Sequence, residues 1–202
     1  MKLGVLVSGN GSNLQALIDA EARDELAPGT IAVVIANKPN IPALARAAAG
    51  GVPAEVVSHA GLDRGEFERR LIAALDRHEV EAVVLAGFMR VLTAEFVARY
   101  PQRIVNTHPS LLPAFPGPDA PAQAIAHGVK LSGVTIHFVD ASLDGGPIIA
   151  QAAVVVEPDD DADSLHAKIQ REEHRLLPAI VQRLAAGQLS CQGRRVVGDR
   201  AE

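Results

Sequence analysis

The sequence predicts an α/β fold with a mostly parallel central sheet, flanked by helices, and an antiparallel C-terminal part. Short apolar runs alternate with longer stretches of helical periodicity through residues 1–100, which is typical of βαβ units around a parallel sheet. A glycine-rich turn joins the first apolar run to the first helical stretch. Beyond residue 131 the pattern changes to alternating polar and apolar positions, which is typical of antiparallel strands with one exposed face.

The first half reads as a regular series of buried strands and helices. Continuous apolar runs of strand length predict strands at 3–7, 31–36, 54–57, 82–86 and 103–106. Asp63 can cap a helix and Glu66 can complete its capping box, before His78 ends that helix. Together with the apolar periodicity, these signals predict helices at 13–22, 42–49, 63–78 and 93–99.

The second half is less regular. Five prolines between 109 and 121 predict a stiff loop without regular helix or central strand. Residues 133–139 read as a half-exposed strand whose antiparallel partner is 148–156. The acidic residues 159–161 read as a solvated start to one long amphipathic helix over 163–186, and 194–197 as at most an edge strand.

Length and composition restrict the class of protein. The 202 residues suit a single domain, 1–202, and 48% hydrophobic residues can fill a sizeable core. A net charge of −5 with 3% aromatic residues argues against a nucleic-acid partner. Cys191 has no disulfide partner, and no apolar run approaches the roughly 20 residues of a membrane span. We therefore expect a cytoplasmic protein with no membrane partner.

The turn at residues 8–13 is the first candidate site. Its glycines permit tight turning, and the free N–H groups of Gly11, Ser12 and Asn13 at a helix start favour a phosphate. A dinucleotide fingerprint would need glycine where Leu14 stands, and no nucleotide-triphosphate loop is present. From the pattern alone, an ordinary βα turn is about as good an interpretation as a phosphate site. The position after a buried parallel strand favours an anion site.

Asn106 and His108 form the second candidate site. Pro109 holds His108 in extended geometry, so side chains two residues apart point the same way. An amide beside an imidazole can stabilise and protonate a developing oxyanion. The other histidines read as structural, with His137 in a structural or supporting role.

Asp144 lies in a glycine-flanked turn that could deliver a carboxylate to the same sheet edge, where it would favour the protonated form of His108. The alternative is a turn aspartate that bonds only its own backbone. No metal-ligand spacing and no Gly-x-Ser-x-Gly pattern occurs, so we expect neither a metal nor a covalent intermediate.

Four segments, taken in order, carry a family resemblance: 5–16, 85–90, 106–113 and 143–151. Together they resemble the phosphoribosylglycinamide formyltransferases, across nearly the whole chain. The 106–113 segment also resembles methionyl-tRNA formyltransferase and formyltetrahydrofolate deformylase. Those relatives carry an additional domain for which a chain of 202 residues leaves no room.

The resemblance implies a Rossmann-like formyltransferase domain that passes a formyl group from 10-formyltetrahydrofolate to the amine of 5-phosphoribosylglycinamide, in purine (IMP) biosynthesis, without a metal and as a monomer or homodimer. Residues 1–100 would form the phosphate-binding half, 101–190 the catalytic and folate-binding half, and 191–202 a tail. Asp119 and Pro121 stand where many relatives carry histidine or a basic residue, and Gln170 where lysine is usual.

The resemblance also assigns residues to three roles. The catalytic residues would be Asn106, His108 and Asp144, with His108 as proton donor. The ribonucleotide would be held by Gly11, Ser12, Asn13, Gln170 and Glu173. The folate site would comprise Arg64, Met89, Arg90, Val91, Leu92, Asn106, Asp140, Ala141, Ser142, Leu143 and Asp144.

Overall fold

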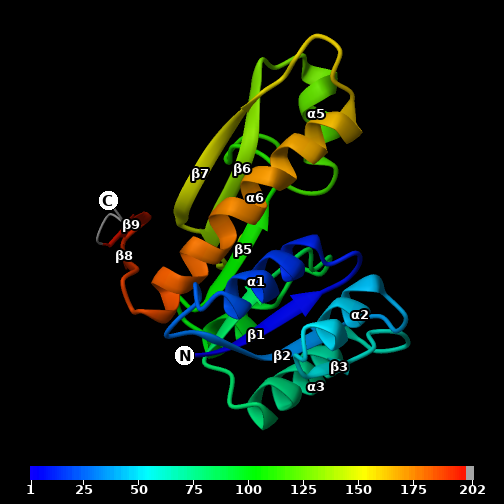
Figure 1. Ribbon diagram of the computed structural model, residues 1–202, viewed down its shortest axis with the longest axis vertical. Helices are drawn as coiled ribbons and strands as arrows, with labels where there is room; N and C mark the ends of the chain where they lie inside the picture. Colours follow the sequence, from blue (N-terminus) through cyan, green and yellow to red (C-terminus); the bar gives the residue numbers. More distant parts are fainter. Residues whose placement is uncertain (199–202) are drawn as a thin grey trace.

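A seven-stranded sheet in the order β3-β2-β1-β4-β5-β6-β7 organises the chain (Figure 1). The computed structural model describes residues 1–198, so the last four residues of the expected tail lie outside it. The strands are β1 (Lys2–Val7), β2 (Thr30–Ala36), β3 (Ala54–Val56), β4 (Ala82–Leu85), β5 (Ile104–His108), β6 (Leu131–Phe138) and β7 (Ile148–Val155). The helices are α1 (Ser12–Ala22), α2 (Pro42–Ala49), α3 (Arg64–Arg77), α4 (Ala94–Arg99), α5 (Ala120–His127) and α6 (Ala162–Ala185).

The strand order creates a crevice beside β1. Strands β3, β2, β1, β4 and β5 are parallel, whereas β6 and β7 each run antiparallel to their neighbour. The predicted mostly parallel sheet with an antiparallel C-terminal part is therefore confirmed. The chain runs from β1 outward through β2 and β3, and then returns to β4 on the other side. Ligands of open α/β sheets bind at such a reversal, outside the carboxyl ends of the strands.

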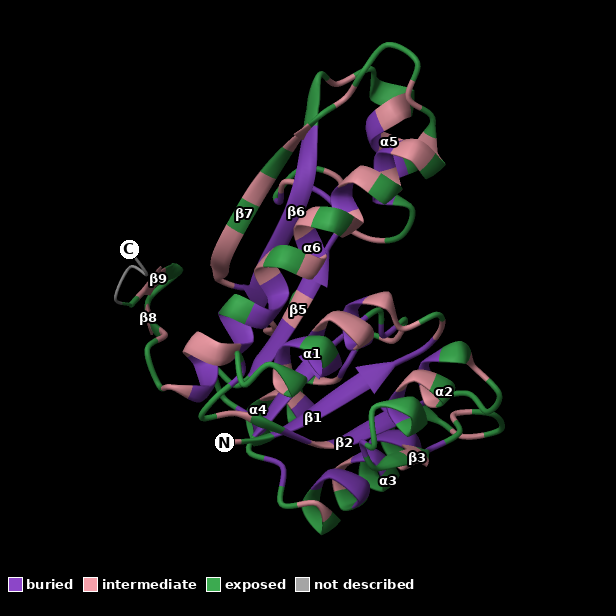
Figure 2. Cartoon of the chain, viewed as in Figure 1, coloured by how far each residue is buried: buried purple, intermediate pink, exposed green. Residues whose placement is uncertain are grey.

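Helices cover both faces of the sheet. One core cluster joins α1, α2 and α6 to the sheet and includes Val5 and Leu177; the other joins α3 and α4 to the opposite face and includes Phe67 and Phe96. The five parallel strands are buried almost throughout, apart from the short edge strand β3 (Figure 2). Burying each large apolar side chain contributes about 1.5–3 kcal/mol, so the core supplies a rigid base for the loops at the crevice.

Most of the longer helices begin at a side-chain cap. The carboxylate of Asp63 accepts from the Glu66 N–H at the start of α3, and Asp161 forms a capping box with Ser164 at the start of α6. The Lys168 ammonium lowers the pKa of the neighbouring Asp160 carboxyl to about 2. The expected helix start in the acidic run is confirmed.

The prediction that residues 133–139 are half-exposed is wrong. Seven of the eight residues of β6 are buried, including Thr135 and His137. The strand lies between β5 and β7, α6 packs against it, and the backbone N–H of Leu112 donates to the Thr135 hydroxyl at 2.9 Å. The polar positions of this strand therefore face a buried polar network instead of solvent. Strand β7 shows the alternation instead.

Two further expectations need correction. The proline-rich segment does not remain a loop to residue 121, because α5 begins at Ala120 with Pro121 in its first turn, where a missing N–H costs nothing. The tail does not add an edge strand to the main sheet. Strands β8 (Ser190–Gln192) and β9 (Arg195–Val197) pair with each other as a separate antiparallel hairpin.

Candidate active site

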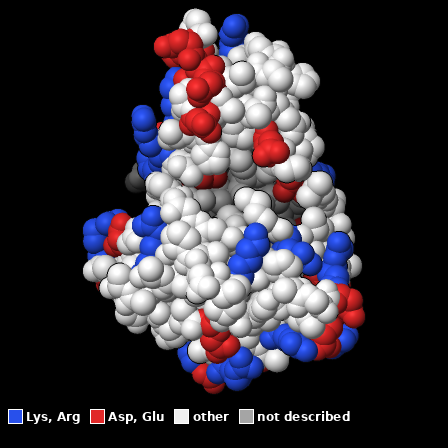
Figure 3. Space-filling view, turned by 90° about the vertical axis from the view of Figure 1, so that its right-hand side faces the viewer, with Lys and Arg blue, Asp and Glu red and all other residues white. Residues whose placement is uncertain are grey.

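The carboxyl edge of the parallel strands is hollowed. Figure 3 shows this face with a depression at mid-height, acidic side chains above it and basic ones below. Strands β1, β4 and β5 end at this edge, so the segments that follow them begin there. The turn between β6 and β7 approaches the same edge. The polar residues singled out in the sequence lie mainly on these segments.

Asn106, His108 and Asp144 come together at the end of β5. His108 Nδ1 lies 3.5 Å from Asp144 Oδ2, and the two side chains are only 7% and 11% exposed. Asn106 and His108 are two residues apart on β5, so both face the same side, whereas Thr107 between them faces the other. The structure thus brings an amide, an imidazole and a carboxylate from two distant segments into one cluster, in which His108 is buried and Asn106 and Asp144 are half-buried.

The contacts of His108 fix the orientation of its ring. Nε2 lies 2.8 Å from the backbone carbonyl oxygen of Phe115, so this nitrogen must carry hydrogen and donate. The other ring nitrogen, Nδ1, faces the Asp144 carboxylate at 3.5 Å, which is longer than a normal hydrogen bond.

His137 orients Asn106. Its Nδ1 donates to the Phe138 carbonyl oxygen at 2.9 Å, which leaves Nε2 as an acceptor, and the Asn106 amide nitrogen lies 3.2 Å from Nε2. Burial lowers the pKa of His137, which keeps the ring neutral and the acceptor intact. One amide hydrogen of Asn106 is thereby held on His137, and the rest of the amide has no hydrogen bond within residues 1–198. The supporting role expected for His137 has this physical basis.

The loop after β5 is held by a buried network centred on Thr135. The Thr135 hydroxyl donates to the Ser110 carbonyl oxygen at 2.7 Å and accepts from the Leu112 N–H. Gln151 on β7 donates to both the Leu112 carbonyl and the Thr135 hydroxyl at 2.9 Å. These bonds fix the path from His108 to Phe115, whose carbonyl in turn holds the imidazole.

The turn that carries Asp144 is tightly constrained. Asp144 has φ 49, in the left-handed region that costs a residue with a Cβ about 1–2 kcal/mol. Its carboxylate accepts from the Gly117 N–H at 2.8 Å. A Cβ at Gly146 would lie 1.8 Å from the Phe138 carbonyl oxygen, so only glycine permits this close approach. The carboxylate is therefore presented by a backbone with little freedom.

The turn after β1 presents an uncapped helix start. Gly11 has φ 76 and stands at the N-cap of α1, and no side chain caps this helix. A Cβ on Gly11 would lie 2.7 Å from that of Ala43, so α2 packs closely under the turn. The first N–H groups of α1, including those of Ser12 and Asn13, and the positive end of the helix dipole thus face the crevice without a protein partner in the described chain.

Arg46 on α2 donates hydrogen bonds to this turn. The sequence analysis did not predict this role for Arg46. Its guanidinium donates to the Asn10 carbonyl at 2.9 Å, the Asn10 side-chain oxygen at 3.2 Å and Gln15 Oε1 at 3.3 Å. A single arginine in an alanine-rich helix gives no motif, so only the spatial approach of α2 reveals its place. Its charge adds to the positive potential at the start of α1.

Glu173 connects the turn to β5. This buried carboxylate accepts from Asn13 Nδ2 at 3.2 Å and from the Thr107 hydroxyl at 2.9 Å. Gln170 lies one turn earlier on α6 and is half-buried, and its side chain has no hydrogen bond within the described chain. The structure therefore joins Glu173 to the 11–13 turn and leaves Gln170 beside it. Thr107 was not expected from the sequence.

The residues expected around a folate line the other side of β5. Phe88 and Leu92 are buried in the same cluster against which Val139 packs, while Met89, Val91 and Leu143 are exposed. This part of the expected folate site is thus mainly apolar. Asp140 accepts from the N–H and hydroxyl of Ser142, and Ala141 is exposed.

The two arginines expected there are less directly placed. The Arg90 guanidinium lies over the Phe67 ring, 5.7 Å from its centre, and within residues 1–198 it makes no hydrogen bond to Asn106 or His108. Arg64 is exposed at the first position of α3, one turn before Phe67, and its side chain has no hydrogen bond within residues 1–198.

Within the described residues, no group of three or more His, Cys, Asp or Glu side chains is placed to hold a metal ion. The helices of this part of the chain are also too short or too polar to cross a membrane.

Comparison with known proteins identifies the class. Residues 1–181 match the Formyl transferase family. The chain therefore belongs to the formyl transferase family, as the sequence resemblance indicated. Among its relatives is the phosphoribosylglycinamide formyltransferase of Escherichia coli K12, 42% identical over 94% of this chain and 89% of the relative.

Other matches agree with this class. A trifunctional purine biosynthetic protein, adenosine-3, of Drosophila melanogaster is 47% identical over 92% of this chain, which spans only 14% of that relative's length. Glycinamide ribonucleotide transformylase 1 of Symbiobacterium toebii superimposes with a TM-score of 0.94 at 44% identity, over 98% of this chain and 93% of that one. A formyltetrahydrofolate deformylase of Burkholderia mallei reaches 0.89 at 31% identity, over 98% and 70%.

The Arg46 contacts lead to a first prediction. Inorganic phosphate at millimolar concentration should raise the midpoint of thermal unfolding, because it binds the folded turn and not the unfolded chain. Arg46→Ala should remove most of this rise, since it takes away both the charge and the bonds that shape the turn. Arg99→Ala, an exposed arginine paired with Asp76, is the matched control and should keep the full rise. An equal rise in both variants would exclude Arg46 from the phosphate site.

Proposed function

We propose that this protein transfers a formyl group from 10-formyltetrahydrofolate to the amine of 5-phosphoribosylglycinamide. The observation that carries the proposal is the cluster of Asn106, His108 and Asp144 at the carboxyl edge of the parallel strands. The uncapped start of α1 with Arg46 suits a phosphate, and the apolar lining at Phe88, Leu92 and Met89 suits a flat heterocycle.

The chemistry needs no group beyond these side chains. The amine nitrogen attacks the formyl carbon, a C–N bond forms, and the carbonyl electron pair moves onto oxygen. The Asn106 amide and the Nδ1–H of His108 stabilise that oxyanion. The bond from the formyl carbon to the folate nitrogen then breaks, and this nitrogen takes a proton. The attacking nitrogen loses one, so His108 and Asp144 together move a single proton.

The two substrates approach from different sides of β5. Gly11, Ser12 and Asn13 bind the phosphate through their N–H groups, and Glu173, already held by Asn13 and Thr107, accepts from a ribose hydroxyl. Gln170 lies next to this subsite. The folate contacts Arg64, residues 89–92 and residues 140–144. Residues 1–202 thus act as a single domain whose halves, 1–100 and 101–190, meet at the reacting atoms.

A spectrophotometric assay tests the proposal. Absorbance reports release of the deformylated folate from a 10-formylfolate donor, with and without 5-phosphoribosylglycinamide. We expect release only when the ribonucleotide is present, and a much higher KM for glycinamide riboside, which lacks the phosphate. Release without any amine would indicate hydrolysis, as in a deformylase. No release under either condition would contradict the proposal.

The proposal also covers the compartment, the partners and the oligomeric state of the protein. A single cysteine and a net charge of −5 suit a cytoplasmic protein without nucleic-acid or membrane partners, acting as a monomer or homodimer and without a metal.

A further inference from the structure

The C-terminal hairpin contacts the turn that carries Asp144. Arg194, between β8 and β9, donates from its guanidinium to the carbonyl oxygen of Gly145 at 2.8 Å. Gly145 directly follows Asp144, so Arg194 holds the backbone of the residue next to the one that bears the carboxylate. The sequence analysis treated residues 191–202 only as a tail, and nothing in the reaction described above uses this arginine.

The turn that carries Asp144 depends on such hydrogen bonds because its residues 141–143 make little contact with the core. Ala141, Ser142 and Leu143 are exposed, so side-chain packing restrains them weakly. Asp144 adopts a left-handed φ of 49, which a residue with a Cβ holds only when its surroundings impose it. On one side the Gly117 N–H fixes its carboxylate. On the other, Arg194 fixes the backbone that follows.

The hairpin is itself anchored and can transmit this restraint. The Cys191 N–H donates to Gln102 Oε1 at 3.3 Å, just before β5. Cys191 and Val196 also pack against the core cluster formed with α1 and α6. In Figure 1 the hairpin lies beside the lower end of β7, where that strand follows the turn. Arg194 is therefore presented from a base attached to the rest of the fold.

We propose that Arg194 is a positioning residue for the transfer reaction: it holds the Asp144 turn in the conformation that places the carboxylate beside His108. The inference rests on the proposed function for its effect on turnover. The effect on the turn itself is independent of any substrate. Loss of one hydrogen bond from an exposed arginine should lower the population of the correct turn by roughly three- to tenfold.

Three variants test the inference: Arg194→Ala, Arg194→Lys and Arg195→Ala. Arg195 is the matched control, because it is exposed, adjacent in the same hairpin and without a side-chain hydrogen bond in the described chain. Hydrogen–deuterium exchange of the peptide covering 140–147 should increase several-fold in Arg194→Ala, remain at the wild-type rate in Arg195→Ala, and be partly restored in Arg194→Lys. Unchanged thermal midpoints would show that all three variants fold.

Kinetics provides the second readout. Arg194→Ala should lower kcat by roughly three- to tenfold and leave the KM for the ribonucleotide unchanged, since the phosphate turn lies elsewhere. Equal exchange in Arg194→Ala and Arg195→Ala would overturn the inference, as would equal kcat in the two variants when wild type is active. If wild type releases no folate in the presence of the ribonucleotide, the proposed function fails, and the exchange comparison alone still decides whether Arg194 holds the turn.

Discussion

His108→Ala should reduce turnover by about 10²–10⁴-fold, the range that a positioned acid or base contributes. In the proposed mechanism, the substitution removes the group that both stabilises the oxyanion and supplies the proton. It should change the KM for the ribonucleotide little, because the proposed phosphate turn lies on another segment. The measurement is kcat from initial rates of folate release with both substrates saturating.

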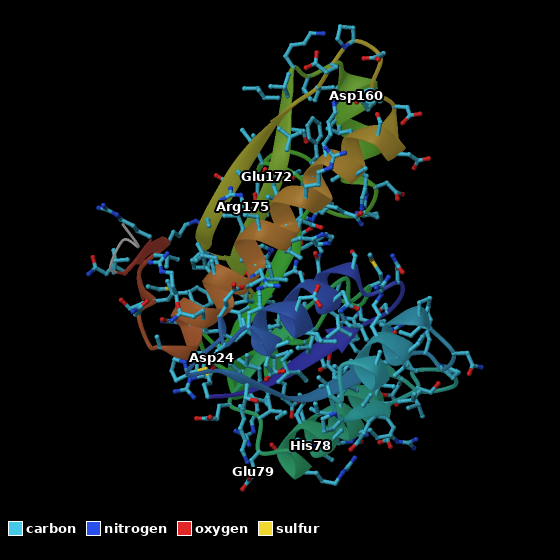
Figure 4. The ribbon with its side chains drawn as sticks, viewed as in Figure 1. Asp24, His78, Glu79, Asp160, Glu172 and Arg175 are labelled. Carbon is cyan, nitrogen blue, oxygen red and sulfur yellow. The ribbon has the colours of Figure 1, made fainter. Side chains whose placement is uncertain are left out.

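The matched control for this variant is His78→Ala. His78 is the C-cap residue of α3, and its Nε2 lies 2.7 Å from Glu55 Oε1 on the edge strand β3, away from His108 (Figure 4). It should retain full turnover. Circular dichroism and the thermal midpoint must show that His108→Ala is folded, since the lost contact with the Phe115 carbonyl also removes one restraint on the loop. A folded variant with near-normal kcat would remove His108 from the mechanism.

Asp144→Asn should have the second largest effect, a loss of about 10²–10³-fold in kcat. The amide keeps the shape of the carboxylate and can still accept from the Gly117 N–H through its oxygen. It no longer provides the negative charge 3.5 Å from His108 Nδ1, so in the proposed mechanism the ring loses its negatively charged partner during proton transfer. The rate should therefore fall without loss of the fold, and the KM for the ribonucleotide should stay nearly constant.

Asp24→Asn is the control for Asp144→Asn. Asp24 is another aspartate in the left-handed region, with φ 62, and it lies in the turn after α1, far from the crevice (Figure 4). Both substitutions exchange a carboxylate for an amide at the same kind of backbone position. Equal kcat in the two variants would show that the charge of Asp144 has no part in catalysis.

The sequence predicted the site best where local geometry decides it. Alternation along a strand and the restriction imposed by Pro109 were enough to put Asn106 and His108 on one side. The burial of the first strands followed from their unbroken apolar runs. Asp144 could be suggested as a partner of His108, although only the folded chain brings the two within 3.5 Å.

The features that sequence reasoning missed depend on long-range contacts. Arg46 is one arginine among alanines until α2 packs under the 8–13 turn. Thr135 and His137 imitate a solvated strand face, because a buried polar network and a wet surface require the same residue types. Helix α5 was missed because Pro121 was interpreted as excluding a helix, when it occupies the first turn.

The alternation along β5 has a consequence for how the enzyme tolerates changes in chain length. Thr107 faces Glu173 while Asn106 and His108 face Asp144 and His137, so one short strand supplies residues to both proposed substrate sides. Insertion of one residue ahead of Asn106 would shift the strand by one position and exchange the two faces. The imidazole would then point toward α6. An insertion in the exposed turn at residues 23–25 moves no such pair. The length of β5 is therefore more tightly constrained than the length of that turn.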